Sequence, residues 1–326
     1  MPMDRVRPST LRMAAGIALA FGLCGMPYAQ AETIAVFTKS QGSPIFAALR
    51  AGAAVAAKSL GVEVIHYVPS TADNVADQNK LVDDAIKDKP AAIVFDPVDF
   101  SKAQGAVDKI NAAQIPLFNA NERLKGGTIA GYVGIDDVAL AKDTGRYLIK
   151  ALKGKGNVVI LDGPDGNRTA TGRAQGFRDA IKEFADVRLL AGKPANYARA
   201  TGKDVTAQLL RAYPQIDGIL AANDPMAIGA VDALKAAGRK AQVVAINASR
   251  EAMELIKSGD IVGSGDYDTF ALGCVALEMA VRSARKEDVP KEVMLKATVV
   301  DKTNYAPFDQ PADKRQCPTL ASVAEK

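Results

Sequence analysis

Residues 218–237 read GILAANDPMAIGAVDALKAA. The stretch opens with the small and branched apolar residues 218–221, which predict a short buried strand. A polar turn follows, and 225–237 then repeats apolar residues at the spacing of an amphipathic helix that starts on a proline. A strand, a polar turn and a helix in this order form one unit of a parallel α/β fold.

The same alternation extends over most of the chain in both directions. We predict ten strands, at 33–37, 62–68, 91–95, 117–119, 129–133, 157–162, 187–191, 218–221, 242–246 and 261–265. Between most of them lie amphipathic stretches that predict helices, among them 45–60, 75–88, 139–152, 173–184, 204–213 and 225–237. Strands rich in Val and Ile on both faces indicate parallel sheets covered by helices on both sides. Ten strands are too many for one comfortable sheet, so we expect an α/β fold with two doubly wound parallel-sheet lobes.

The N-terminus carries the features of an export signal. Arg5, Arg7 and Arg12 precede the apolar run 13–23, and Ala29-Gln30-Ala31 offers the small-x-small pattern of a signal peptidase site. We therefore expect residues 1–31 to be a cleaved signal peptide and the rest of the chain to be periplasmic.

Two other interpretations of this leader are weaker. A lipoprotein signal ending at Cys24 is disfavoured because Leu23 stands where a small residue is expected. An uncleaved anchor is disfavoured because the apolar run is too short to span a bilayer comfortably.

Composition disfavours several other classes of protein. The leader holds three Arg and one Asp, so the net charge of +4 falls to +2 in residues 32–326, where basic and acidic residues alternate. That pattern disfavours nucleic acid as a partner, and no other segment predicts direct membrane insertion. His66 is the only histidine and lies within a predicted strand, which excludes a multi-histidine metal site. Nucleotide-binding glycine motifs are absent too, so we expect no cofactor, no metal and no catalytic residue.

Two cysteines follow the leader, Cys274 and Cys317. An oxidising compartment would allow them to form a disulfide. Cys274 also lies in the helical run ALGCVALEMAV, where a small buried residue would serve equally well, so the sequence leaves both interpretations open.

Polar side chains follow many of the predicted strands. Ligands of open parallel sheets bind beyond the carboxyl ends of the strands. Amides or carboxylates occupy six such ends, at 39–44, 120–123, 163–168, 223–226, 247–249 and 266–268. One such residue alone would be explained as a helix cap or a turn. Six in the same topological place suit a ligand covered in hydroxyls, because each hydroxyl both donates and accepts a hydrogen bond.

Five short stretches carry a family resemblance: SPIF at 43–46, IPLF at 115–118, RAQGF at 173–177, PANY at 194–197 and ANDPMAIGA at 222–230. With these, residues 33–301 resemble the ribose-binding and LacI-like periplasmic sugar-binding proteins of the type I periplasmic binding fold. The resemblance implies an ABC-importer substrate-binding component, which hands its ligand to a membrane permease and its ATPase. We expect a monomer.

The resemblance also implies two lobes joined by a three-segment hinge, with the ligand cleft between them. We place lobe I at 32–135 plus 267–296 and lobe II at 136–266 plus 297–326. The ligand-binding residues that it implies are Ser43, Phe46, Asn121, Glu122, Arg173, Tyr197, Asn223, Asn247 and Asp266, with Lys39 as a weaker assignment. Phe46 and Tyr197 would stack on a sugar ring, and the others would bond its hydroxyls.

Departures from the family pattern bear on the ligand. Ribose binders carry Asp-Arg where this chain has Asn121-Glu122, and they carry Asp and Gln where it has Asn247 and Asp266. The predicted pocket then balances Arg173, with Lys39, against two carboxylates. That balance disfavours an anionic ligand and ribose itself, and it favours a neutral monosaccharide or polyol or an amine-bearing ligand such as an aminosugar.

Other functions compete with transport. A LacI-type regulator would need a helix-turn-helix where this chain has its leader, and an enzyme would need a nucleophile with a base or a cofactor motif. A sensory receptor for chemotaxis or two-component signalling would bind the same ligand class, so the sequence leaves that alternative open.

Overall fold

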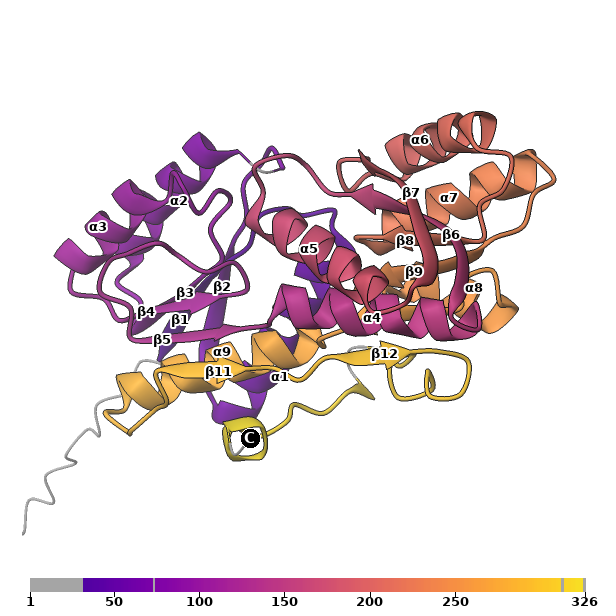
Figure 1. Cartoon of the computed structure of the whole chain (residues 1–326). Helices are drawn as coiled ribbons and strands as arrows, with labels where there is room; N and C mark the ends of the chain where they lie inside the picture. Colours follow the sequence, from indigo (N-terminus) through magenta and orange to yellow (C-terminus); the bar gives the residue numbers. More distant parts are fainter. Residues whose placement is uncertain (1–31, 73, 312–313, 325–326) are drawn as a thin grey trace, which may run out of the picture. The chain divides into compact units, whose positions relative to one another are not determined.

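The computed structural model describes residues 32–72, 74–311 and 314–324, so the predicted leader and Cys24 lie outside the described residues. Its strands form two six-stranded sheets (Figure 1). The first has the order β11-β5-β4-β3-β1-β2, with β1 (Thr33–Phe37), β2 (Glu63–Tyr67), β3 (Ala92–Phe95), β4 (Leu117–Ala120), β5 (Gly131–Gly134) and β11 (Glu292–Met294). The second has the order β12-β10-β9-β8-β6-β7, with β6 (Lys155–Asp162), β7 (Asp186–Pro194), β8 (Gly218–Ala221), β9 (Gln242–Ile246), β10 (Gly263–Asp266) and β12 (Thr298–Val300).

The pairing of the strands confirms the predicted fold class. Among the described strands, all neighbours pair in parallel except β10 and β12, which are antiparallel. Every residue of β3 and β8 is buried, as expected for strands covered on both faces. The ten predicted strands are all present, within a few residues of their predicted ends. The sequence analysis missed β11 and β12, which are three residues each and too short to show a period.

Ten helices connect and cover the sheets in the described part of the chain. They are α1 (Pro44–Leu60), α2 (Val75–Asp88), α3 (Gln104–Ala112), α4 (Asp137–Ala151), α5 (Arg168–Lys182), α6 (Arg199–Ala212), α7 (Asp224–Ala236), α8 (Arg250–Ser258), α9 (Thr269–Ala284) and α10 (Leu320–Ala324). Helices α1 and α9 pack closely because glycines meet at their contact. A Cβ on Gly52 would lie 1.9 Å from the Phe270 carbonyl oxygen, and one on Gly273 would lie 2.0 Å from that of Leu49.

The chain passes between the two sheets three times. It leaves the first sheet after β5, because α4 packs on β8, β9 and β10 of the second. It returns after β10, because α9 packs on β1, β3, β4 and β5 of the first. The third passage runs from β11 to β12. The polar carboxyl ends of strands from both sheets therefore lie close to these passages.

The C-terminal segment is held by a disulfide. Cys317 is bonded to Cys274 of α9, which resolves the alternative left open by the sequence in favour of the bridge. Helix α10 contacts α9 and β11. The end of the chain thus packs on elements of the first sheet, whereas the sequence analysis placed the whole of 297–326 in the second lobe. The bridge explains the difference, because it fixes Cys317 to a helix of the first sheet.

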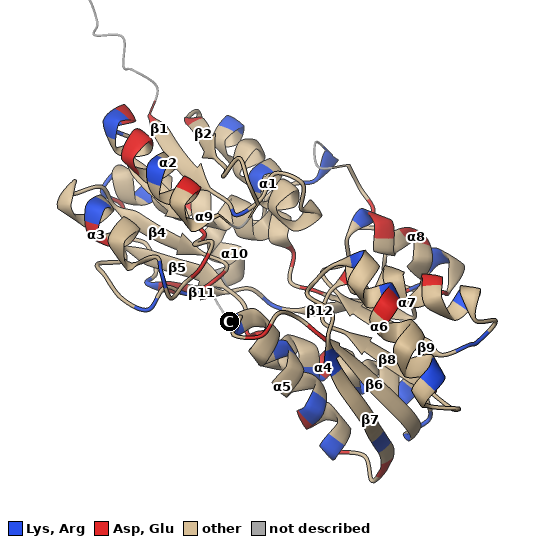
Figure 2. Ribbon diagram, turned by 90° about the horizontal axis from the view of Figure 1, so that it is seen from above, with Lys and Arg blue, Asp and Glu red and all other residues tan. Residues whose placement is uncertain are grey.

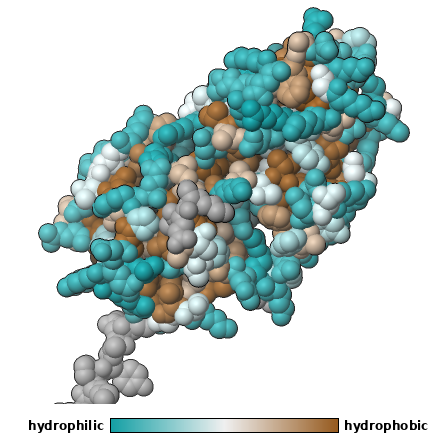
Figure 3. All heavy atoms as spheres, turned by 60° about the horizontal axis from the view of Figure 1, so that its bottom comes forward, coloured by the Kyte–Doolittle hydropathy of each residue, from teal (hydrophilic) through white to brown (hydrophobic). Residues whose placement is uncertain are grey.

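The described surface is mixed in charge and hydropathy. Figure 2 shows Lys and Arg interspersed with Asp and Glu on the helices of both sheets. On the face in Figure 3, hydrophilic residues surround smaller hydrophobic areas. Within the described residues, every helix is too short or too polar to cross a membrane.

Candidate functional site

A cavity of about 770 Å³ lies where the carboxyl ends of the two sheets meet. Its size is that of an ordinary small-molecule site. Loops that follow strands of both sheets line it, as expected for open parallel sheets. The structure brings together nine of the ten residues predicted from the sequence: Lys39, Ser43, Phe46, Asn121, Glu122, Arg173, Tyr197, Asn223 and Asn247.

On the first-sheet side, three charged side chains form a buried cluster. Lys39, which follows β1, is paired with Glu122, which follows β4. Lys39 Nζ also lies 3.9 Å from Asp96 Oδ1, and Asp96 directly follows β3. Burial raises the pKa of Asp96 to about 7, although the nearby Lys39 ammonium works against the rise. The Lys39 ammonium thus compensates one carboxylate of the cluster, and the raised pKa of Asp96 reduces the negative charge of the other.

Buried amides hold the loops of this wall in place. Asn119 Nδ2 donates to the Glu122 carbonyl oxygen at 2.9 Å, and its Oδ1 accepts from the Leu124 amide at 3.0 Å. Asn121 has a left-handed backbone with φ of 61°, and its Nδ2 donates to Asp96 Oδ2 at 3.1 Å. Asn tolerates this conformation better than most residues, so the turn presents Glu122 to the cavity at little cost.

On the second-sheet side, Arg173 is the central group. It lies in α5 and is only 3% exposed. Its Nε donates to Asp137 Oδ1 at 2.9 Å, and its Nη1 donates to the Ala222 carbonyl oxygen at 2.8 Å and to Asn247 Oδ1 at 3.3 Å. The guanidinium thus joins the start of α4 to the turns after β8 and β9, three separate parts of the wall.

Asn223 combines a structural role with its place in the cavity. Its Oδ1 caps α7 by accepting from the Met226 amide at 3.0 Å, and its Nδ2 donates to the Tyr197 carbonyl oxygen at 3.0 Å. Tyr197 has φ of 58°, which is uncommon for a non-glycine residue. Its hydroxyl is buried, and no described residue bonds to it. Asn223 is thus both the cap of α7 and a residue of the cavity wall.

Asp224 is a buried group of the cavity that the sequence analysis did not single out. It accepts from the Ser249 amide at 2.5 Å and from Ser264 Oγ at 2.7 Å. Burial raises its pKa to about 6, although these hydrogen bonds favour the charged form. Asp224 thus joins the turns after β8 and β9 to β10.

More aromatic residues line the cavity than were predicted. Phe46 and Tyr197 are joined by Phe100 and Tyr267. Phe100 follows β3, whose end was not among the six predicted to carry the site, and Tyr267 follows Asp266 at the second passage between the sheets. The signal for Phe100 was its position just beyond a strand end, the same criterion that identified the other residues.

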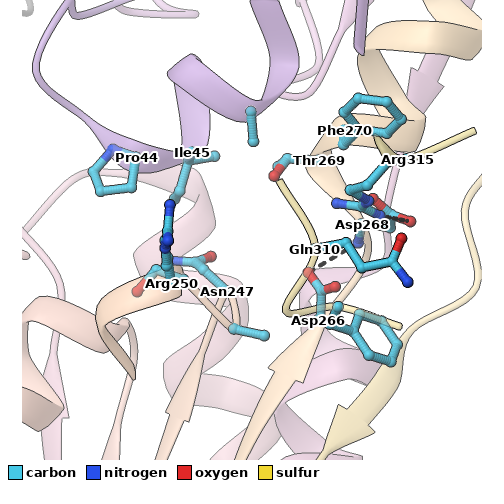
Figure 4. Close-up of a pocket in the computed structure, with 14 residues that line it drawn as sticks. Pro44, Ile45, Asn247, Arg250, Asp266, Asp268, Thr269, Phe270, Gln310 and Arg315 are labelled. Atoms are coloured by element: carbon cyan, nitrogen blue, oxygen red, sulfur yellow. Dashed lines mark hydrogen bonds and ion pairs between the residues drawn. The ribbon is translucent and has the colours of Figure 1, made fainter. Parts of the chain in front are cut away.

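The structure does not place Asp266 in this cavity. It lines a separate cavity of about 170 Å³, together with Asp268, Gln310 and Arg315 (Figure 4). Asn247 borders both cavities. Asp266 is 7% exposed, and its Oδ1 accepts from the Asp268 amide at 2.9 Å. Burial, and then the nearby Asp268 carboxylate, raise the pKa of Asp266 to about 8.

Each cation that lines the main cavity already has a carboxylate partner. Lys39 pairs with Glu122, Lys102 with Asp99, and Arg173 with Asp137. Across residues 32–72, 74–311 and 314–324, the His, Cys, Asp and Glu side chains form no group of three that could hold a metal ion. The arrangement can therefore bond a polar molecule, but it has no surplus positive charge.

Comparison with known proteins is consistent with this geometry. A model of the periplasmic binding protein domain matches residues 34–288. A xylitol-binding protein of Mycolicibacterium smegmatis is 30% identical over 76% of this chain and 71% of its own length. A D-apiose import binding protein of Actinobacillus succinogenes is 31% identical over 72% of this chain and 75% of its own length.

A solved structure shares both sequence and fold with this chain. It is an ABC transporter periplasmic solute binding protein of Actinobacillus succinogenes with bound D-allose, with a TM-score of 0.80 and 31% identity. The similarity covers 83% of this chain and 98% of the solved one. At 31% identity, the two proteins are similar in sequence as well as in fold.

Proposed function

This chain belongs to the family of periplasmic binding proteins, and we propose that it captures a neutral monosaccharide or polyol and delivers it to an ABC importer. Relatives named for xylitol and D-apiose, and a solved relative with D-allose, support this class of ligand. The partners of the proposal are a small polar ligand and the permease and ATPase of the importer. A binding protein of this kind would catalyse no reaction and would need no cofactor.

One observation carries the choice of a neutral ligand. The cations that line the cavity, Lys39, Lys102 and Arg173, are each paired with a carboxylate of the protein. A sugar phosphate or a uronate would bring a further negative charge into a buried site with no cation left to compensate it, which is costly. Hydroxyl groups carry no charge and suit the amides, carboxylates and aromatic rings around them.

We propose the residues of the main cavity as the ligand contacts. They are Ser43, Phe46, Asn121, Glu122, Arg173, Tyr197, Asn223 and Asn247, with Lys39 and, beyond the predicted set, Phe100 and Asp224. Asp266 would act on the ligand only through its neighbours Asn247 and Tyr267. In this proposal the two sheets are the cores of two lobes, which close on the ligand about the three passages of the chain.

The family supports a periplasmic location, and we propose that residues 1–31 direct export and are cleaved after Ala31. Mass spectrometry of the protein purified from the periplasm tests this directly. An N-terminus at Glu32 is expected. Retention of the leader, or a lipid on Cys24, would contradict it.

A thermal-shift panel tests the proposed ligand class. Xylitol, D-apiose, D-allose and other neutral sugars and polyols are added to the cleaved protein, alongside glucosamine, glucuronate and glucose 6-phosphate. A ligand at 100 times its dissociation constant should add about 2.7 kcal/mol of stability, which raises the melting temperature clearly. Stabilisation by a neutral sugar or polyol, and none by the two anions, is expected. Stabilisation by the anions alone would overturn the proposal, and by glucosamine alone would favour the amine-bearing alternative.

A further inference from the structure

The segment that follows β12 has anchors on both sheets. Asp309 Oδ2 lies 2.5 Å from Lys257 Nζ of α8, and the same ammonium lies 5.5 Å from the ring centre of Tyr305. Helix α8 packs on α7 and β10, which belong to the second sheet's side of the molecule. The first anchor therefore attaches the segment to the second sheet.

The second anchor lies on α9, which packs on the first sheet. Arg315 Nη2 lies 2.6 Å from Asp268 Oδ2, and the guanidinium carbon lies 4.5 Å from the ring centre of Phe270. Two residues further on, Cys317 is bonded to Cys274. The Leu320 amide then donates to Glu278 at 2.9 Å. In Figure 1 the yellow segment after β12 runs back to α10 beside β11.

From these two anchors we propose that the C-terminal segment is a strap across the hinge, with Arg315 as the positioning residue that fixes it to the passage between β10 and α9. The proposal requires the two sheets to move relative to one another, as the proposed function does, but it does not depend on the identity of the ligand. In addition to the three passages described above, the backbone from β12 to Cys317 thus makes a fourth connection, which side-chain contacts and the disulfide hold in place.

The length of the strap sets how far the sheets can separate. Asp309 and Arg315 are six residues apart in the sequence, and six extended residues span about 20 Å at most. A rotation that moved the two anchor points of the segment, at Asp309 and Arg315, further apart than this would have to break one of the two ion pairs. With both anchors engaged, the strap therefore limits how widely the molecule can open on this side.

Arg315 acts through the carboxylate of Asp268. Asp268 caps α9 by accepting from the Ala271 amide at 3.0 Å, from a left-handed backbone with φ of 58°. The buried Asp266 lies two residues earlier and faces the same small cavity, which Gln310 and Phe308 of the strap also line (Figure 4). Arg315 supplies the positive charge that holds Asp268 beside Asp266. Loss of Arg315 should therefore loosen the passage itself as well as the strap.

Three variants cut the strap at different points. Arg315→Gln removes its ion pair with Asp268, and Lys257→Met removes the pair with Asp309 together with a local pair with Glu254. Both keep the disulfide, whereas the double variant Cys274→Ser/Cys317→Ser removes it. Two controls remove similar ion pairs that do not join the sheets. Lys235→Met breaks a pair with Asp260 at 2.7 Å, and Lys109→Met breaks a pair between α3 and Asp83 of α2 at 2.6 Å.

The measurements are made on the ligand-free, cleaved protein. Small-angle scattering gives the radius of gyration, and hydrogen exchange with mass spectrometry gives the protection of residues 134–137, the passage that the strap does not touch. We expect each strap variant to have a larger radius of gyration and several-fold faster exchange at 134–137, with both controls like the parent. A role confined to local packing would speed exchange only in 305–324 and at the start of α9.

The proposal is wrong if Arg315→Gln and Lys257→Met both match the controls in radius and in exchange at 134–137. Because both keep the disulfide, they decide the question even if the double cysteine variant fails to fold, which circular dichroism would show. The sugar panel is a separate experiment, so a failure to bind neutral sugars leaves these results interpretable.

Discussion

The two walls of the main cavity hold their polar groups in different ways. On the first-sheet side, the Lys39 ammonium lies beside the carboxylates of Glu122 and Asp96. On the second-sheet side, Arg173 and Asn223 join neighbouring turns and helix starts through hydrogen bonds to both side chains and backbone. The second wall is thus part of the scaffold of its lobe, whereas the first is a set of charges whose balance a ligand can alter.

This difference predicts where substitutions act. Changes in the second wall should reduce both folding stability and affinity, because the same side chains serve both. Changes in the first wall should alter the selectivity for ligand charge more than they alter stability.

Arg173→Ala should have the largest effect. It leaves Asp137, Asn247 and the Ala222 carbonyl without their common donor, and breaking a buried ion pair costs about 3–5 kcal/mol. Affinity for the best neutral sugar of the panel should fall as well. Chemical denaturation and calorimetry measure the two effects separately.

Arg178→Ala is the control for that variant. Arg178 lies on the same helix, is 38% exposed by side chain and pairs with Asp162 at 3.2 Å. Loss of a partly exposed pair costs about 1 kcal/mol or less. Arg178 does not line the cavity, so affinity should not change. An equal loss of affinity in both variants would mean that α5 presents another face to the ligand.

Asp266→Asn should stabilise the protein at high pH. The pKa of Asp266 in the folded protein is about 8, above its ordinary value of 3.8. A raised pKa means that the folded state holds the proton more tightly, so the parent loses stability as pH rises from about 4 to about 8. Asn does not titrate, so its advantage over the parent should grow across this range to on the order of 3 kcal/mol. Melting temperatures at pH 5 and pH 8.5 measure it, and an equal difference at both would contradict the burial of a titrating carboxyl.

Glu122→Gln should change selectivity. It removes the carboxylate paired with Lys39 and makes this wall of the cavity less negative by one charge, which favours an anionic ligand. We expect affinity for neutral sugars to fall about tenfold, as for one lost charged hydrogen bond, and glucuronate to gain relative to them. Glu292→Gln, which breaks an exposed pair with Arg123, is the matched control and should change neither. Parallel losses for neutral and anionic sugars in Glu122→Gln would argue against the charge-balance account.

Ser43→Ala should have the smallest effect on stability. Ser43 stands at the N-cap of α1 but makes no side-chain cap, whereas Asn223 caps α7. Thermal melts should show a change within about 0.5 kcal/mol for Ser43→Ala and a loss of about 1 kcal/mol for Asn223→Ala. A Ser43→Ala loss as large as that of Asn223→Ala would mean that Ser43 is structural.

The sequence predicted the core of the fold because buried parallel strands are continuous apolar runs. The edge strands β11 and β12 have no such run, and only their partners β5 and β10 define them. The path of the last segment was missed for a similar reason. That path depends on whether Cys317 is bonded to Cys274 of α9, and a single sequence does not show this.

The residues of the site were predicted where strand ends show them. Asp96 was missed although it directly follows a predicted strand, and Asp224 was quoted within a motif without being assigned a role. Asp266 was assigned to the main cavity, but it lies in the smaller one. Which of two adjacent side chains at the end of a strand faces a given cavity depends on the backbone of the turn, and here Tyr267 lines the main cavity whereas Asp266 lines the smaller one. Sequence periodicity carries no information about that turn.

The three passages between the sheets also constrain how the chain can fold. The first sheet gains its edge strand from Glu292–Met294 and the second from Thr298–Val300, so neither is complete until nearly the whole chain is available. Before then, β5 and β10 each have an edge without a neighbour, and such edges favour association with other chains. Contacts between residues so distant in sequence also form slowly. The chain is thus most prone to aggregate before its last segments have added β11 and β12, and chaperones would be needed most at that stage.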